Sequence, residues 1–249
     1  MRKMRYEKLD GIRGMALLHM IAYHTIWDLV YLYQFDWHWY KSKGAYIWQQ
    51  GICWTFIFLS GFCWSLGGHA YKRGMIVFLG GAIITIVTLF AMPQNRVIFG
   101  VLTLIGSCML LMQLLNRWMR KLSPVIGIVG SAGLFLLTRN INSGFLGFEH
   151  WNIVPLPEIL YNNIFMTYLG FTQKEFYSTD YFSLFPWIFL FVAGYFTYQF
   201  VSDKKGMLFL QKSVLYPIEW IGKHSFEIYM VHQPAIYIIL ELIHRLGIY

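Results

Sequence analysis

Seven runs of hydrophobic residues, separated by polar stretches, follow one another along the chain. A helix that crosses the apolar part of a bilayer needs about 20 mostly hydrophobic residues, and the runs approach that length. The fifth run is the shortest. The pattern predicts an all-α, polytopic transmembrane helical bundle of about seven spans. We place the spans at residues 11–33, 46–66, 75–92, 97–115, 124–138, 184–201 and 226–244.

The composition supports a membrane protein. Hydrophobic residues make up 57% of the 249 residues and charged residues 13%, and the mean hydropathy is +0.48. A soluble domain carries about 25% charged residues, so half of the usual polar surface is missing. Three cysteines lie inside apolar runs, and Cys53 and Cys63 are about 15 Å apart along one helix, too far to form a disulfide. Without an internal repeat, residues 1–249 are predicted to form a single integral-membrane domain in the cell membrane.

Basic residues gather in alternate connections between the spans. With the N-terminus inside, fourteen of the 20 Lys and Arg residues fall in inner segments and six in outer segments, which predicts an inner N-terminus and an outer C-terminus. This dispersed placement argues against nucleic acid as a partner, despite the net charge of +8. The inner residues are Arg2, Lys3, Arg5, Lys8, Arg13, Lys72, Arg73, Arg117, Arg120, Lys121, Lys204, Lys205, Lys212 and Lys223. The outer residues are Lys41, Lys43, Arg96, Arg139, Lys174 and Arg245.

Two connections are predicted to have structure of their own. The outer segment 139–183 is long for a connection in a compact domain, which is typical of function or disorder, and its many aromatic residues argue against disorder. We expect it to fold back over the bundle, with a short helix at residues 157–169. The inner segment 202–223 has the apolar stretch 207–210 among lysines and is predicted to lie on the membrane surface.

Small residues recur within several spans and predict close packing between helices. The glycines concerned are Gly11, Gly14, Gly80, Gly81, Gly127, Gly130 and Gly133.

Ionisable residues form a stripe along the first span. Such residues cost at least about 2.5 kcal/mol each inside a bilayer and mark a functional site by default. Arg13 and His24 are eleven residues apart, so they share one helix face and lie about 16 Å apart along the axis. The same face carries Asp10, Gly14, Asp28 and Tyr31, whereas His19 lies opposite and is predicted to have no role.

This stripe predicts a polar cleft with a titratable base. His24 and Asp28 are one helical turn apart, so the carboxylate could fix the imidazole tautomer and stabilise its protonated form, as general base catalysis requires. Arg13 would place a cation at the inner mouth of the cleft. The structural alternative is that Asp28 only satisfies a buried histidine and that Arg13 extends to the lipid headgroups.

Two further histidines are candidates for the site. His232 lies near the middle of the last span, beside Gln233 and Pro234, and Pro234 is predicted to kink that helix. His232 either completes the site or pairs with a neighbouring Tyr or Gln. His38 in the outer loop is a surface residue or an outer catalytic base. No spacing of His and Cys suits zinc, so we expect no metal.

Several segments together resemble the catalytic-domain family of heparan-alpha-glucosaminide N-acetyltransferase, and the pattern of Arg13 and His24 is also similar to the membrane acyltransferase-3 family. The segments are residues 9–14 (LDGIRG), 20–24 (MIAYH) with Asp28, 58–62 (FLSGF), 99–102 (FGVL), 104–106 (LIG), 180–182 (DYF), 186–187 (PW), 221–225 (IGKHS) and 232–234 (HQP). The resemblance implies that Arg13 serves acyl-donor binding and His24 catalysis. In larger eukaryotic relatives the catalytic histidine follows the first span, which keeps His38 as a second candidate. Thr103 stands where relatives commonly have histidine.

These features together predict a membrane acyltransferase that moves an acetyl group from cytosolic acetyl-CoA to an outer-side glycan or amino-sugar acceptor. A thioester arm that enters past Arg13 has about three helical turns to reach His24, which would act as base or as covalent acyl carrier. Asp10 and Arg13 are further residues assigned to donor binding, and the inner basic residues Lys72, Arg73, Arg120 and Lys121 could bind the donor phosphates. The alternative is a transporter or channel that uses the midplane His and Asp for protons or a solute, although its expected internal repeat is missing. An oligomer is compatible with the sequence.

Overall fold

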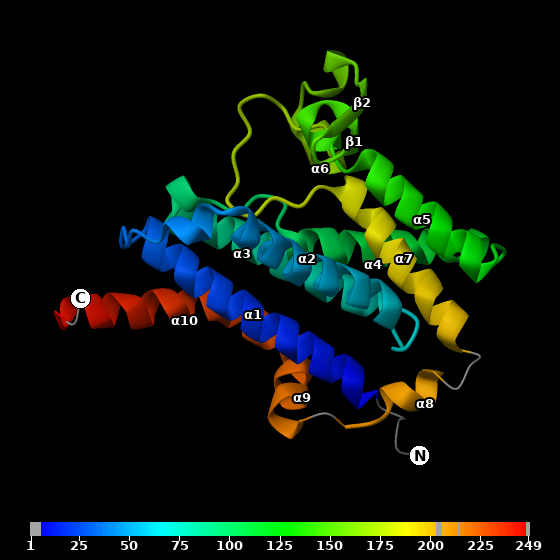
Figure 1. Ribbon diagram of the computed structural model, residues 1–249, viewed down its shortest axis with the longest axis horizontal. Helices are drawn as coiled ribbons and strands as arrows, with labels where there is room; N and C mark the ends of the chain where they lie inside the picture. Colours follow the sequence, from blue (N-terminus) through cyan, green and yellow to red (C-terminus); the bar gives the residue numbers. More distant parts are fainter. Residues whose placement is uncertain (1–5, 203–205, 214, 248–249) are drawn as a thin grey trace. The chain divides into compact units, whose positions relative to one another are not determined.

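The computed structural model describes residues 6–202, 206–213 and 215–247, and nearly all of its regular structure is helical (Figure 1). The α-helices are α1 (Glu7–Tyr31), α2 (Lys43–Cys63), α3 (Ala70–Ala91), α4 (Val101–Met119), α5 (Pro124–Thr138), α6 (Ile164–Leu169), α7 (Leu184–Ser202), α8 (Gly206–Leu210), α9 (Tyr216–Lys223) and α10 (Ser225–Arg245). Short 3₁₀ turns are η1 (His38–Lys41), η2 (Pro93–Asn95), η3 (Ile141–Ser143) and η4 (Glu158–Leu160). Strands β1 (Phe145–Phe148) and β2 (Trp151–Pro155) form one antiparallel hairpin.

Each of the seven predicted spans coincides with a long helix, which confirms the all-α polytopic fold. Among the described residues, five helices are long and apolar enough to cross a membrane: α3, α4, α7, α10 and the stretch Pro124–Ser143 that begins with α5. The helices α1 and α2 have 25 and 21 residues, and both contain many polar side chains. The count of seven spans and the orientation of the termini stay predictions. Of the basic residues behind that orientation, Arg2, Lys3, Arg5, Lys204 and Lys205 lie outside the described residues.

The chain divides into two compact units, which we describe separately. The terminal unit comprises Met1–Phe56 and Lys205–Tyr249, and the central unit comprises Ile57–Lys204. The prediction of a single domain is not tested by this division.

In the terminal unit, α1 packs on α9 and α10. The α1–α9 crossing is a backbone contact between glycines: a Cβ on Gly222 would lie 1.8 Å from the Asp10 carbonyl oxygen, and one on Gly14 would lie 2.0 Å from the Ile218 carbonyl oxygen. Any larger residue would force the helices apart. A core of Leu17, Met20 and Ile52 continues from the crossing toward the middle of α1, so α1 is held over most of its length.

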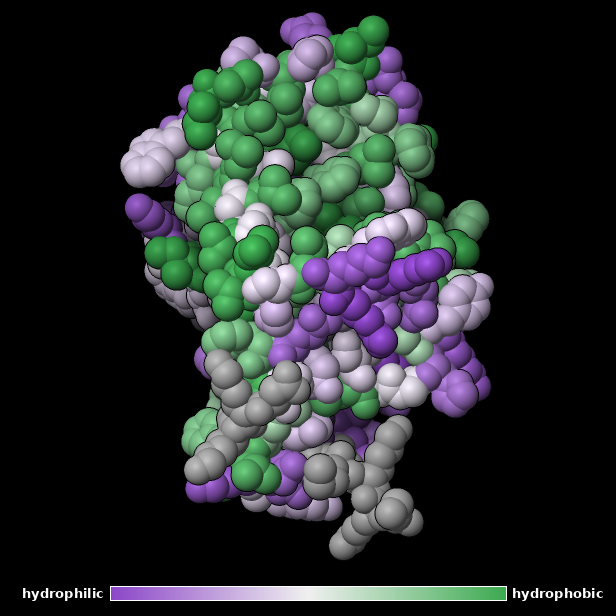
Figure 2. Space-filling view, turned by 90° about the vertical axis from the view of Figure 1, so that its right-hand side faces the viewer, coloured by the Kyte–Doolittle hydropathy of each residue, from purple (hydrophilic) through white to green (hydrophobic). Residues whose placement is uncertain are grey.

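In the central unit, α3 pairs with α4 and α5 pairs with α7 (Figure 1). Glycine again permits the close contacts, because a Cβ on Gly81 would meet the Thr103 backbone and one on Gly127 would meet the Phe196 ring. The predicted packing role of Gly130 and Gly133 was wrong, because a Cβ on either would meet nothing within 4 Å. Figure 2 shows a broad hydrophobic surface on the side of the central unit where α5 and α7 lie, as a lipid-facing surface requires.

The outer segment 139–183 is more structured than predicted. The predicted helix at 157–169 is broken into η4 and α6, because Asn163 caps α6 by accepting a hydrogen bond from the Met166 backbone N–H at 2.9 Å. The β1–β2 hairpin was not predicted. Its first strand contains an irregularity between Leu146 and Gly147, where Gly147 has a φ of +145°. Asn142 ties the segment together by donating to the Gly170 carbonyl oxygen and the Ser183 hydroxyl. The predicted inner surface piece contains two short helices, α8 and α9.

Candidate functional site

Two histidines from the first and last long helices meet inside the terminal unit. His24 on α1 and His232 on α10 are joined by a hydrogen bond of 2.8 Å between His24 Nδ1 and His232 Nε2. The rings stack with their planes 28° apart. His232 is 7% exposed and His24 is half-buried, so the pair is shielded from water on the His232 side.

The hydrogen bonds define the tautomer of each ring. His232 Nδ1 lies 2.6 Å from the Tyr229 carbonyl oxygen, and a carbonyl oxygen can only accept, so Nδ1 carries the hydrogen. The Nε2 atom of a neutral His232 therefore accepts, and the donor is the His24 Nδ1–H group. His24 is left with its lone pair on Nε2, which makes that atom the base or nucleophile of the pair.

Asp28 lies one turn further along α1 and contacts Gln233 instead of His24. It is fully buried, and its Oδ1 accepts a hydrogen bond of 2.7 Å from Gln233 Nε2. Gln233 is also close enough to His24 to interact with it. Asp28 is therefore linked to His24 through Gln233, and the orienting contact that the sequence assigned to Asp28 is made by His232.

Arg13 lies at the α1–α9 crossing and is bound to Asp10. Their side chains form an ion pair of 2.9 Å, with 23% of Arg13 and 13% of Asp10 exposed. Because the crossing is fixed by Gly14 and Gly222, the position of this ion pair on the helix is fixed too. Arg13 at one end of the stripe is therefore held by the helix crossing, and His24 at the other end is held by its hydrogen bond to His232. Both residues belong to the terminal unit.

The other basic candidates lie in the central unit, at the end where α3 begins and α4 ends. Arg73 donates from Nη2 to the Trp64 and Gly67 carbonyl oxygens, at 2.8 and 3.1 Å, and so closes the turn after α2. Arg120 donates from Nε to Asn116 Oδ1 at 3.3 Å. Lys72 and Lys121 are exposed. Exposed cations therefore gather at this end of the α3–α4 pair.

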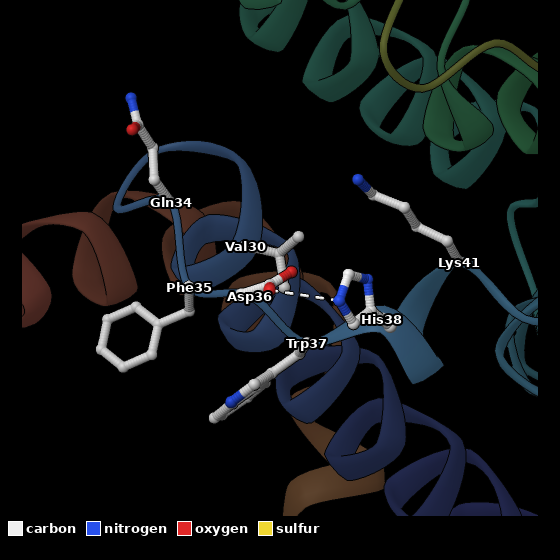
Figure 3. Close-up of a pocket in the computed structure, with 7 residues that line it drawn as sticks. All are labelled: Val30, Gln34, Phe35, Asp36, Trp37, His38 and Lys41. Atoms are coloured by element: carbon white, nitrogen blue, oxygen red, sulfur yellow. Dashed lines mark ion pairs between the residues drawn. The ribbon is translucent and has the colours of Figure 1, made fainter.

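His38 lies apart from the histidine pair, in a pocket of about 250 Å³ formed by the loop after α1 (Figure 3). Its Nε2 is 3.1 Å from Asp36 Oδ2, and 85% of the His38 side chain is exposed. Lys41 also lines the pocket. The His38 ring is therefore surrounded mostly by solvent, whereas the pair of His24 and His232 is held by two hydrogen bonds within the protein.

His19, predicted to have no role, accepts a hydrogen bond of 3.1 Å from Trp48 Nε1 on α2. Thr103 on α4 is buried and packs against Gly81 of α3. Among the described residues, no group of three or more His, Cys, Asp or Glu side chains could hold a metal ion.

Segments that are distant in sequence but share the family pattern pack in pairs. Residues 9–14 meet residues 221–225 at the glycine crossing, and His24 meets His232. In the central unit, the Phe182 backbone N–H donates to the Phe99 carbonyl oxygen at 2.8 Å. The segments that carry the resemblance therefore contact one another in the fold.

Asp180 belongs to the last of these pairs, where it lies beside Gly100 at the start of α4. Burial raises the pKa of the Asp180 carboxyl to about 6, and a hydrogen bond from the Val101 backbone N–H opposes part of the increase. This carboxyl therefore accepts a hydrogen bond at the N-terminus of α4, and it becomes protonated and neutral under mildly acidic conditions.

The fold indicates an integral membrane protein in which a hydrogen-bonded pair of histidines joins the helices α1 and α10. The sequence matches the family described as heparan-alpha-glucosaminide N-acetyltransferase, catalytic, over residues 5–234, and the chain belongs to this family. No curated protein and no solved structure matches it.

Proposed function

We propose that the protein is an acetyl-CoA-dependent acetyltransferase of the cell membrane, which transfers an acetyl group from the cytosolic donor to a glycan or amino-sugar acceptor on the outer side. The observation that carries the proposal is the hydrogen-bonded pair of His24 and His232, which leaves a lone pair on His24 Nε2. The family supports acetyl transfer and disfavours a transporter or channel, because its description names a catalytic N-acetyltransferase.

In the proposed reaction, an amine or hydroxyl of the acceptor attacks the thioester carbonyl carbon of acetyl-CoA. His24 Nε2 takes the proton that the attacking nitrogen or oxygen loses. The tetrahedral intermediate collapses, the C–S bond breaks, and the CoA thiolate recovers the proton from His24. An N- or O-acetylated acceptor and free CoA result, so no oxidant or further reactant is needed.

His232 acts as a positioning residue in this scheme. It accepts from His24 Nδ1–H and so holds the ring with Nε2 toward the acceptor. When His24 becomes a cation, the hydrogen bond to His232 becomes charge-assisted and stronger. The Tyr229 carbonyl oxygen fixes His232 in turn, so a chain of two hydrogen bonds leads from the base to the helix backbone.

The donor is proposed to bind through basic residues on the cytosolic side. Arg13 lies about 16 Å from His24 along α1, a distance comparable with an extended pantetheine arm, and its pairing with Asp10 fixes its guanidinium in one direction. Within the central unit, Lys72, Arg120 and Lys121 are separate candidates for phosphate binding, since their ammonium and guanidinium groups bind phosphate as point charges or forks. Arg73 has less to offer, because carbonyl oxygens already bind one of its nitrogens.

The test is acetyl transfer by the full chain in lipid nanodiscs, with radiolabelled acetyl-CoA and glucosamine as donor and acceptor. His24→Ala should lower turnover by about 10²- to 10⁴-fold, the usual range for loss of a general base, while acetyl-CoA binding stays near that of the wild type. His19→Ala is the matched control, because His19 lies on the same helix and its hydrogen bond is to Trp48 on α2, away from His232. Normal turnover in His24→Ala, with loss in His38→Ala, would place the base in the outer loop.

Donor binding has a separate test that needs no turnover. Arg13→Ala should weaken acetyl-CoA binding, and wild-type binding should weaken with added salt because ions screen the phosphate contacts. Binding that is independent of salt and survives Arg13→Ala would show that the donor enters elsewhere.

A further inference from the structure

Two buried oxygen atoms beside the histidine pair lack hydrogen-bond donors. Asp28 Oδ2 and Gln233 Oε1 are both inaccessible to solvent and have no partner among the described residues. The neighbouring atoms of the same two groups are bonded to each other, because Gln233 Nε2 donates to Asp28 Oδ1. A buried acceptor without a donor is costly, and a carboxylate oxygen is among the most costly.

Both unpaired atoms are acceptors, which restricts what can satisfy them. A carboxylate oxygen and an amide oxygen offer lone pairs and no hydrogens. Their complement is a group with two or more N–H or O–H hydrogens, and a positive charge on that group would match the negative charge of Asp28. A neutral amine meets the first condition and an ammonium group meets both, whereas a lone hydroxyl meets neither fully. Only the neutral amine has the lone pair for attack, so a bound ammonium group releases one proton to water before the step in which His24 takes the other.

The position of these atoms ties them to the reacting centre. Asp28 follows His24 by one turn of α1, about 6 Å along the axis, and Gln233 directly follows His232 on α10. Gln233 is also near enough to His24 to influence it, although its Oε1 forms no hydrogen bond with His24 or with any other described residue. A group bound to Asp28 and Gln233 would therefore lie next to the base that has to receive its proton.

We propose that Asp28 and Gln233 form an acceptor clamp, in which Asp28 Oδ2 and Gln233 Oε1 bind the donor hydrogens of the acceptor's amine and hold it beside His24. The inference rests on the proposed function for the identity of the bound molecule. It makes Asp28 and Gln233 determinants of acceptor binding, with no part in binding acetyl-CoA.

One substitution removes the clamp and preserves the fold. In Asp28→Asn, the new side-chain oxygen still accepts from Gln233 Nε2, and its new NH₂ group can donate to Gln233 Oε1. The two amides then satisfy each other and leave no free acceptor. We expect Asp28→Asn to melt at or above the wild-type temperature, since a buried unpaired charge has been removed.

The clamp is tested by binding of glucosamine, with glucose as the comparison that lacks the amine. Calorimetry uses the wild type, Asp28→Asn and Thr25→Val in nanodiscs with CoA present. Thr25→Val is the matched control, because the Thr25 hydroxyl donates to the Ile21 carbonyl oxygen of its own helix. Asp28→Asn should weaken glucosamine binding by about 10- to 100-fold, the loss expected for a hydrogen bond to a charged group, and leave acetyl-CoA binding unchanged. The wild type should prefer glucosamine to glucose.

The outcomes separate this inference from the proposed function. Equal glucosamine binding by the wild type and Asp28→Asn overturns the clamp, and it would mean that a proton between the two oxygens satisfies them internally. A parallel loss of acetyl-CoA binding overturns it too, because the substitution would then act through the fold. If the wild type binds glucosamine through Asp28 but transfers no acetyl group, the clamp is supported and the proposed function fails.

Discussion

Replacing His232 by alanine removes the acceptor that holds the His24 ring in one tautomer. The two rings are joined by a hydrogen bond of 2.8 Å, which becomes charge-assisted when His24 is protonated in the proposed transition state. A hydrogen bond to a charged group contributes about 1.5–3 kcal/mol, and each 1.36 kcal/mol changes a rate tenfold. We therefore expect His232→Ala to lower kcat by about 10- to 150-fold, with little change in KM for acetyl-CoA.

A conservative variant separates positioning from packing. In His232→Gln, the side-chain oxygen can accept from His24 Nδ1–H in place of His232 Nε2, so part of the lost kcat should return. Turnover of both variants is measured as CoA release with glucosamine as acceptor, beside the melting temperature of each protein. Turnover of His232→Ala within twofold of the wild type would refute the reasoning, as would a loss in KM alone.

Three further predictions concern the fold and its electrostatics. Gly222→Ala should destabilise the protein by about 1–3 kcal/mol or more, because the new Cβ would lie 1.8 Å from the Asp10 carbonyl oxygen. Gly51→Ala is the control and should melt like the wild type, because its Cβ would meet nothing within 4 Å. Burial raises the pKa of Asp180 to about 6, so its contribution to stability is present at low pH and is lost as the pH rises through 6. The difference in melting temperature between pH 5 and pH 8 should therefore be smaller in Asp180→Asn than in the wild type. An unchanged difference would exclude Asp180 as the cause. Single cysteines at the exposed Lys174 and Lys212, in a background without the native cysteines, should react with an impermeant maleimide from opposite sides of the membrane; labelling of both from one side would contradict the topology.

The hydrophobic runs predicted the long helices well, because a span must satisfy its backbone hydrogen bonds internally and be mostly apolar along its length. The run at residues 124–138 coincides with α5 at both ends. The outer segment was harder to predict. Its hairpin depends on hydrogen bonds such as the one from Asn140 Nδ2 to the Glu149 carbonyl oxygen. The pattern of hydrophobic and polar residues does not predict such contacts.

For the site, helical geometry along α1 grouped Arg13 with His24 and Asp28, since these residues are local to one helix. Geometry within one helix could not show that His232 would take the orienting position next to His24. It also left Gln233 without a role, because its hydrogen bond to Asp28 spans 205 residues of sequence. The Tyr229 carbonyl oxygen could not be found from residue types at all, although its i−3 spacing from His232 is a local clue.

The hydrogen bond between His24 and His232 also has a consequence for biosynthesis. The two residues are 208 positions apart, so His24 emerges from the ribosome long before its partner His232. While the chain is being synthesised, α1 carries a polar face with neither α9 nor α10 to cover it. The site therefore forms only when the last long helix joins the first, and a chain that stops before residue 232 would reach the membrane with an unpaired His24 and a buried carboxylate lacking Gln233.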